Sequence, residues 1–245
     1  MERKEFLKMG LSSLGFMTIA PLVLNSCKTT TVDAATISIP TTGSTNGSSA
    51  SDCTVNPSET AGPFPTKDPA SYVIKDIKSG RIGVSMLANI TIKNKNNSCS
   101  NLAGVIVDIW HCDADGNYSE YGGNGMQPTN YTSVHFLRGR QTSDANGLVS
   151  FATIFPGWYG GRAVHIHAHI YNASGKSLLV TQIAFPATIC DTVFTTATSF
   201  YKKGKADTTN ERDNIFNDGY ANQLATLTGD ITNGYTLTHN IVVSA

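Results

Sequence analysis

One short stretch, from position 164 to position 170, alternates histidine with apolar residues. The histidines are His165, His167 and His169. Successive side chains of a β-strand point to opposite faces, so the alternation predicts a strand with three histidines on one face and apolar residues in the core. Two residues of strand advance about 6.5 Å, which lets two imidazoles reach one metal ion. The stretch therefore predicts a sheet and half of a metal site, although ordinary solvated sheet faces carry the same pattern.

The rest of the chain is typical of a loop-rich β protein. Glycine numbers 22, and charged residues make up only 15% of the 245 residues. Strands are expected at 86–93, 104–112, 178–185 and 231–243, with turn-rich segments between them. Because no βαβ period is present, we predict an all-β fold, an antiparallel β-sandwich with long loops.

Two segments carry more local predictions. Strand-like residues 134–138 and 148–155 flank Asn146-Gly147, a dipeptide preferred in tight hairpin turns, so a hairpin is expected there. Residues 195–205 are expected to form a short helix or a loop.

The first fifty residues are expected to be a signal and a tether. Residues 1–26 join a charged start to an interrupted apolar stretch, which predicts a lipoprotein-type signal peptide rather than a membrane span. Leu24-Asn-Ser-Cys27 resembles a bacterial lipobox, in which Cys27 carries the lipid anchor. Residues 27–51 are rich in Ser and Thr and predict a flexible linker. Residues 52–245 are long enough for one domain with a sizeable core.

The leader also predicts a location. We expect an exported bacterial lipoprotein of the cell envelope, periplasmic or at the surface, with membrane contact only through the anchor at Cys27. Arg3-Lys-Glu-Phe-Leu-Lys8 is similar to the twin-arginine export signal, with Lys4 in place of the second arginine, and an ordinary secretory signal is the alternative. Basic and acidic residues number 18 each, which argues against a nucleic-acid partner.

Four cysteines remain in the predicted domain: Cys53, Cys99, Cys112 and Cys190. In an exported protein they predict up to two disulfides, with three possible pairings, and four sequestered thiols are the alternative. No pair has the two-residue spacing of a zinc site, so a cysteine-ligated zinc is not expected.

Five short motifs occur in one order along the chain. They are Thr60-Ala-Gly-Pro-Phe64, Val107-Asp-Ile-Trp-His-Cys-Asp113 with Gly116-Asn-Tyr118, Phe151-Ala-Thr-Ile-Phe-Pro-Gly-Trp-Tyr159, Gly161-Arg162 and His165-Ile-His167. Together they resemble the intradiol ring-cleavage dioxygenases, most closely the secreted, single-domain branch. The resemblance covers residues 57–185, and the shared order makes it specific although each motif is short.

This resemblance implies a non-haem Fe(III) centre with two tyrosine and two histidine ligands. The matching positions are Tyr118, Tyr159, His165 and His167. Phenolate oxygen suits a hard ferric ion better than thiolate does, so the residue types agree with the metal. In the family the second tyrosine leaves the iron when substrate arrives and takes its proton, a role that falls to Tyr159.

The resemblance also implies the surroundings of the metal. Arg162 matches the family's active-site arginine and is expected to stabilise negative charge that develops on the substrate. Gln182 matches the glutamine that orients the substrate. Thr60, Gly62 and Pro63 match a segment that borders the substrate pocket. Each of these residues also has an ordinary structural reading, but all of them occur together at the family's spacings.

The implied activity is cleavage of a catechol-type aromatic diol by O2 to a cis,cis-muconate-type diacid. The alternative is a lipid-anchored, non-catalytic β-sandwich binding module, because a fold does not fix a function. A third hypothesis is a zinc or copper site at His165, His167 and His169. His111 and His169 match no family ligand and are expected to be structural. The short Tyr159-to-His165 spacing predicts an open pocket, and the oligomeric state is left unassigned.

Overall fold

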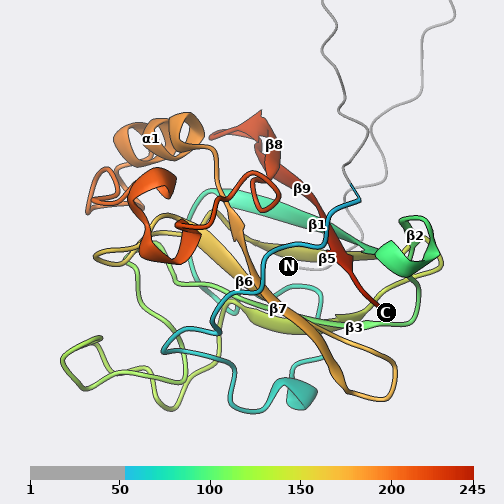
Figure 1. The fold of residues 1–245 in the computed structure, drawn as a ribbon. Coiled ribbons are helices and arrows are strands. Elements are labelled where there is room, and N and C mark those ends of the chain that lie inside the picture. The colour runs from blue at the N-terminus through green and yellow to red at the C-terminus, as the bar shows by residue number, and fades with distance from the viewer. Residues whose placement is uncertain (1–52) are drawn as a thin grey trace, which may run out of the picture. The chain divides into compact units, whose positions relative to one another are not determined.

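A computed structural model describes residues 53–245. The predicted signal peptide, residues 1–26, and linker, residues 27–51, lie outside the described residues. Two β-sheets pack face to face around one large hydrophobic core, and long loops connect the strands (Figure 1). The predicted all-β sandwich is therefore confirmed.

The first sheet contains five strands. Its path runs from β2 (Ser100–Asn101) through β1 (Ser85–Asn94) and β9 (Gly234–Val243) to β8 (Thr226–Asp230). Strand β5 (Leu148–Ile154) pairs with β1 on the same edge as the short β2. Strands β1 and β9 run parallel, so this one pair departs from the predicted antiparallel arrangement.

The second sheet contains four antiparallel strands. Its order is β4 (Arg138–Thr142), β3 (Ile106–Trp110), β6 (His165–Tyr171) and β7 (Ser177–Ala184). The predicted alternation is confirmed on β6, where Ile166, Ala168 and Ile170 enter the core. The opposite face of β6 is left for histidine, and it carries the candidate site.

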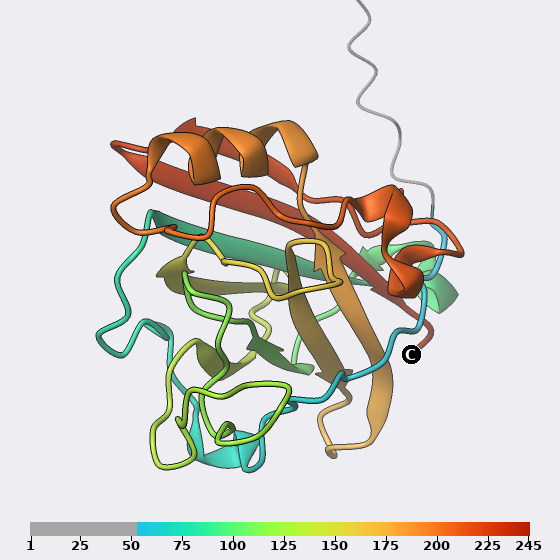
Figure 2. The same cartoon turned by 90° about the vertical axis from the view of Figure 1, so that its left-hand side faces the viewer.

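The helices are short. The α-helix α1 (Ala187–Thr196) lies beside β8 in both views (Figures 1 and 2). Four 3-10 helices complete the described elements: η1 (Pro69–Ser71), η2 (Lys95–Asn97), η3 (Asn210–Arg212) and η4 (Asn214–Phe216).

Helix α1 begins earlier than the segment 195–205 in which a short helix or loop was expected. Its Cys190, Val193 and Phe194 occupy successive turns and are buried in the core. This spacing of three and four residues is the helical period, and burial of that face stabilises the helix. Residues 197–205 contain only turns and irregular backbone.

The hairpin predicted at Asn146-Gly147 is wrong, although the turn itself is present. The Gly147 N–H donates to the Asp144 carbonyl over 2.9 Å, which closes the turn. However, β4 pairs with β3 in one sheet, whereas β5 pairs with β1 in the other. The turn thus carries the chain between the two sheets.

Disulfides and sequestered thiols were the two alternatives for the four cysteines, and the structure contains both. Cys53 and Cys99 form a disulfide that ties the start of the described chain to the segment after β1. Cys112 and Cys190 are free and buried. Within the described residues, no helix is long and apolar enough to cross a membrane.

Candidate metal centre

The two predicted tyrosines lie on loops that interlock. Tyr118 follows a turn in which the Asn117 N–H donates to the Asp113 carboxylate over 2.8 Å. Gly116 in this turn has φ +87°, and a Cβ there would collide with the carbonyl of Trp158 on the second loop. Only glycine permits both this conformation and this close approach. The loops therefore bring the rings of Tyr118 and Tyr159 to 5.8 Å between centroids.

The loop that follows Tyr118 holds the backbone of this tyrosine. The side chain of Gln127 accepts from the Tyr118 N–H over 2.7 Å and donates back to the Tyr118 carbonyl over 2.8 Å. One buried amide thus fixes the backbone of this tyrosine.

The two predicted histidines converge on one point. The Nδ1 of His165 lies 2.6 Å from the carbonyl of Ala163, which can only accept, so this nitrogen carries the proton. The Nε2 of His165 therefore presents a lone pair. It lies 3.1 Å from the Nε2 of His167 and 3.4 Å from the hydroxyl of Tyr118. Three of the four predicted ligands thus meet at hydrogen-bonding distance.

Aromatic rings and one glycine form the walls of the centre. The Trp110 indole stacks on the His167 imidazole, with centroids 4.8 Å apart and planes within 1°. Phe64 stacks on Tyr118 at 4.8 Å. Gly62 leaves the open space, because a Cβ there would lie 3.0 Å from Cε1 and 3.5 Å from Nε2 of His167.

Hydrogen bonds connect Arg162 to the proposed ligand Tyr159 and to the loop that contains Thr60. The Nη2 of Arg162 donates to Gln182 Oε1 over 2.5 Å, and the Gln182 amide donates to the Thr60 carbonyl over 2.9 Å. Its Nη1 lies 3.4 Å from the hydroxyl of Tyr159. Its Nε donates to both carboxylate oxygens of Asp213 over 2.9 Å. The structure therefore brings together all six predicted ligand and catalytic residues.

Two of the predicted pocket residues, Thr60 and Gly62, border the centre. The third, Pro63, is near the centre only because it follows Gly62 in the chain. Pro63 is exposed, whereas the next residue, Phe64, is buried against Tyr118. The pocket segment thus contacts the centre through Gly62 and Phe64.

Burial sets the protonation of these groups. It raises the pKa of Tyr118 well above the usual value for tyrosine, and it raises the pKa of Tyr159, where Arg162 acts in the opposite direction. Burial lowers the pKa of His165 to about 3, and the Arg162 charge adds to that shift. Burial, with the adjacent His165, also lowers the pKa of His167. Protein groups alone therefore give neutral imidazoles and neutral phenols.

This donor set fits a ferric ion. Neutral imidazole is the ligating form of histidine. The facing Nε2 atoms of His165 and His167 repel each other unless a proton or a cation lies between them. A cation at this point would also stabilise phenolate at Tyr118, against the effect of burial. Two phenolate oxygens and two imidazole nitrogens form the hard, anionic donor set that suits Fe(III).

The remaining histidines near the sheet are structural, as expected. His111 is fully buried, with Nδ1 2.8 Å from the Cys112 carbonyl and Nε2 2.7 Å from the Thr153 hydroxyl. His169 contacts Ser177 over 2.8 Å and Tyr171 over 2.7 Å. In residues 53–245, no three His, Cys, Asp or Glu side chains gather as a metal site. The zinc or copper hypothesis therefore finds no site there.

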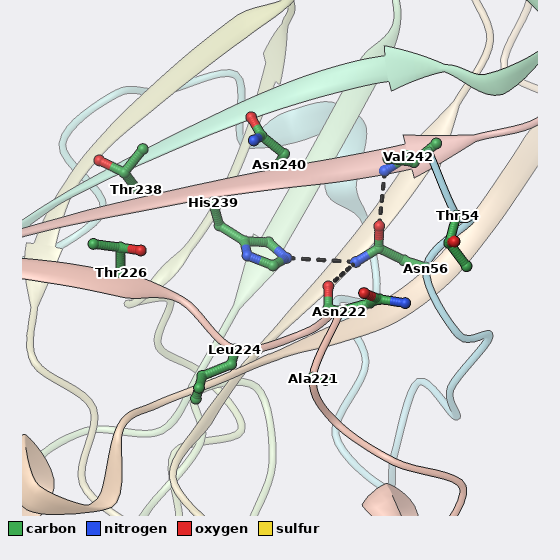
Figure 3. A pocket seen from close by; sticks show the side chains of 10 residues that line it. All are labelled: Thr54, Asn56, Ala221, Asn222, Leu224, Thr226, Thr238, His239, Asn240 and Val242. Carbon is green, nitrogen blue, oxygen red and sulfur yellow. Dashed lines mark hydrogen bonds between the residues drawn. The ribbon is translucent and has the colours of Figure 1, made fainter. Parts of the chain in front are cut away.

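A separate hollow of about 510 Å³ lies beside the start of the described chain (Figure 3). Asn56 crosses it, contacting the carbonyl of Asn222, the N–H of Val242 and the ring of His239. None of the predicted site residues lines this hollow. Its neutral hydrogen bonds join the start of the described chain to β9 and to the loop that contains Asn222.

Sequence reasoning missed three residues that build the centre: Trp110, Gln127 and Asp213. Trp110 lies opposite His167 on the neighbouring strand. Its place in an apolar, strand-like run of the sequence was the signal that could have identified it. Gln127 and Asp213 lie in segments without a periodic pattern, and nothing local distinguishes them from other polar loop residues.

A protein-family model described as "Dioxygenase" matches residues 67–200, more than half of the chain. No curated protein matches the sequence. The fold is similar to that of an intradiol ring-cleavage dioxygenase from Tetranychus urticae, with a TM-score of 0.69 and 25% identity. That match covers 78% of this chain and 95% of the other.

Two bacterial structures share the fold at lower identity. The dioxygenase domain of a dioxygenase–carbohydrate-binding protein fusion from Streptomyces sp. SirexAA-E has a TM-score of 0.57 and 23% identity, over 78% of this chain and 99% of that one. The 3-chlorocatechol 1,2-dioxygenase from Rhodococcus opacus 1CP has a TM-score of 0.52 and 19% identity, over 78% of this chain and 73% of that one.

Proposed function

The chain belongs to the intradiol ring-cleavage dioxygenases, and from this premise we propose that it cleaves a catechol-type aromatic diol with O2. Ferric iron is the proposed cofactor, and a cis,cis-muconate-type diacid is the proposed product. The observation that carries the proposal is the convergence of Tyr118, His165 and His167, with Tyr159 and Arg162 beside them.

Tyr118, Tyr159, His165 and His167 would hold the iron. Bound Fe(III) supplies positive charge that deprotonates phenols and activates a bound catechol toward O2. The chain contributes the dry, rigid setting. Tyr118 is fully buried and fixed by Gln127. Tyr118 is therefore the tyrosine suited to a permanent ligand.

Tyr159 is suited to the proton transfer. It is only partly buried, and its hydroxyl lies 3.4 Å from Arg162 Nη1. The arginine charge stabilises a phenolate there, and burial favours the neutral phenol. A balanced tyrosine of this kind can accept a proton from an entering diol and keep it.

Arg162 and Gln182 would orient the substrate. Two Arg162 Nη groups point to Gln182 and Tyr159, so its positive charge lies at the edge of the centre. A fixed donor of this kind stabilises negative charge that develops on the opening ring. Gly62 keeps the face of His167 open, and the Phe64 ring supplies an aromatic wall for a flat substrate.

The direct test is product analysis. The purified full-length chain, loaded with ferric iron, is given catechol in air enriched in ¹⁸O2, and products are identified by mass spectrometry. We expect a diacid that carries both atoms of one O2 molecule. A protein that binds iron and catechol but forms no diacid would be the non-catalytic binding module instead.

We also propose export and lipid anchoring at Cys27, on the strength of the leader sequence alone. In a bacterial host the full chain should enter the membrane fraction, with a mature N-terminal peptide that begins at an acylated Cys27. Cys27→Ser should release the protein to a soluble fraction. An unprocessed chain, or one with an unmodified Cys27, would contradict the proposal.

A further inference from the structure

Asp213 is the most fully engaged carboxylate near the proposed centre. Its side chain has no exposed area, and both oxygens lie 2.9 Å from the Nε of Arg162. Oδ2 also accepts from the Ala163 N–H over 2.8 Å, and Oδ1 accepts from the Ile215 N–H over 2.9 Å. The carboxylate is therefore held by main chain on both sides and cannot follow a moving arginine.

The place of this contact on the guanidinium determines what it does. Asp213 uses only Nε, which leaves Nη1 for Tyr159 and Nη2 for Gln182. A guanidinium is planar, so fixing one edge fixes the direction of the other donors. On the remaining side, Phe216 packs with its ring centroid 5.9 Å from the Arg162 carbon Cζ.

The segment that supplies Asp213 lies beyond the residues that the family model matches. The family model ends at residue 200, whereas Asp213 lies between η3 and η4. Asp213 caps η4 through the Ile215 N–H, and Phe216 in the same turn is buried with Ala163. This segment thus packs against Ala163, two residues before the strand that carries the histidines.

We propose that Asp213 is a positioning residue for ring cleavage, which holds Arg162 with its Nη groups directed at Tyr159 and Gln182, at the edge of the substrate site. The inference rests on the proposed function, because the position of Arg162 affects catalysis only if the protein cleaves a catechol. Asp213 also offsets part of the arginine charge, so Arg162 attracts a carboxylate on the substrate ring less strongly, while its Nη groups still lie beside the charge that develops on the opening ring. The site accordingly suits diols without an acidic ring substituent.

The first test does not require iron or turnover. The Arg162 Nε–H is followed by ¹H–¹⁵N NMR in the metal-free full-length chain and assigned by its disappearance in Arg162→Lys. We expect a slowly exchanging signal that exchanges at least about tenfold faster in Asp213→Asn. Asp218→Asn, an exposed aspartate in the same segment, is the matched control and should leave the signal unchanged. An unchanged exchange rate of the Arg162 Nε–H in Asp213→Asn would show that Asp213 does not hold the arginine and would overturn the proposal.

The second test measures the reaction. With catechol, Asp213→Asn should lower kcat about 100-fold, the usual effect of a misplaced catalytic group, while KM changes little. The visible iron band should stay near that of the wild type, although loss of the buried ion pair with Arg162 lowers the melting temperature, and Asp213→Glu should recover part of kcat. A kcat within twofold of the wild type would overturn the positioning role.

The two failures are distinguishable. If the wild type forms no diacid, the proposed function fails, and the NMR experiment still decides whether Asp213 holds Arg162. If the wild type is active and Asp213→Asn is equally active, only the inference about Asp213 fails. Preference is tested with 3,4-dihydroxybenzoate, for which we expect a kcat/KM well below that for catechol. A preference for the acid would overturn the charge-balance argument.

Discussion

Replacing Arg138 with methionine should destabilise the domain strongly, because this arginine joins two segments behind Tyr118. Its side chain is 1% exposed. It donates to the Ser119 hydroxyl over 2.8 Å and carbonyl over 2.6 Å, and to the Phe64 carbonyl over 2.8 Å. It also lies 3.6 Å from the equally buried carboxylate of Glu120. Methionine keeps the apolar stem and removes every one of these contacts.

The expected loss follows from what remains behind. Breaking a buried ion pair from one side costs about 3–5 kcal/mol, because a buried charge is left without its partner. Glu120 keeps the Lys67 N–H at 2.7 Å and His135 at 3.1 Å, so we place the loss near the middle, at about 4 kcal/mol. For a domain of this size, that corresponds to a fall in melting temperature of roughly 8–16 °C.

Urea unfolding followed by circular dichroism measures this loss, with Lys205→Met as the control. Lys205 pairs with Asp191 over 2.6 Å, but the side chains are 58% and 50% exposed, so the control should lose at most about 1 kcal/mol. Adding Glu120→Gln to Arg138→Met should recover part of the lost stability, because it removes the buried Glu120 charge that Arg138→Met leaves without its partner. Equal losses for Arg138→Met and Lys205→Met, or no recovery in the double variant, would refute the reasoning.

Three further outcomes are expected. Burial lowers the pKa of His111 to about 4, so the unfolded chain binds a proton that the folded chain does not. Stability should therefore fall as the pH drops from about 6.5 to 4, by about 1.4 kcal/mol per unit for this group, and His111→Phe should flatten that slope in urea titrations. Gly62→Ala places a methyl 3.0 Å from His167 at φ +69° and should reduce ferric binding, measured as iron content, and cost about 1–2 kcal/mol; full iron loading would contradict this. Replacing Cys53 and Cys99 by serine opens a loop with a separation of 46 residues and should cost about 2–4 kcal/mol in thermal unfolding, whereas an unchanged melting temperature would show that the disulfide is dispensable.

The sequence predicts those parts of the centre whose geometry is set by residues close together in the chain. Alternation on β6 places His165 and His167 on one face, because the period of a strand leaves no other arrangement. The turn before Tyr118 follows from its Asp, Gly and Asn residues. These patterns, with their order along the chain, were sufficient to identify the family.

Partners that are distant in sequence were not predictable in the same way. The turn at Asn146-Gly147 is local chemistry, but nothing local states that the strand after it pairs with β1 in the other sheet. The parallel pairing of β1 with β9 joins residues that are far apart in the chain. Asp213 reaches Arg162 across 51 positions, through a segment with no periodic pattern. In each case the tertiary fold supplies the contact, and the residues themselves carry no signal for it.

Tyr118, Tyr159, His165 and His167 are proposed to hold ferric iron for reaction with a catechol. The most direct measurement is the visible spectrum of the ferric-loaded chain under nitrogen, before and after addition of catechol, for the wild type and Tyr118→Phe. We expect a broad tyrosinate-to-iron band that shifts when catechol binds and decays as diacid forms in air, and that is lost in Tyr118→Phe. A wild-type protein that remains colourless after ferric loading would contradict the claim.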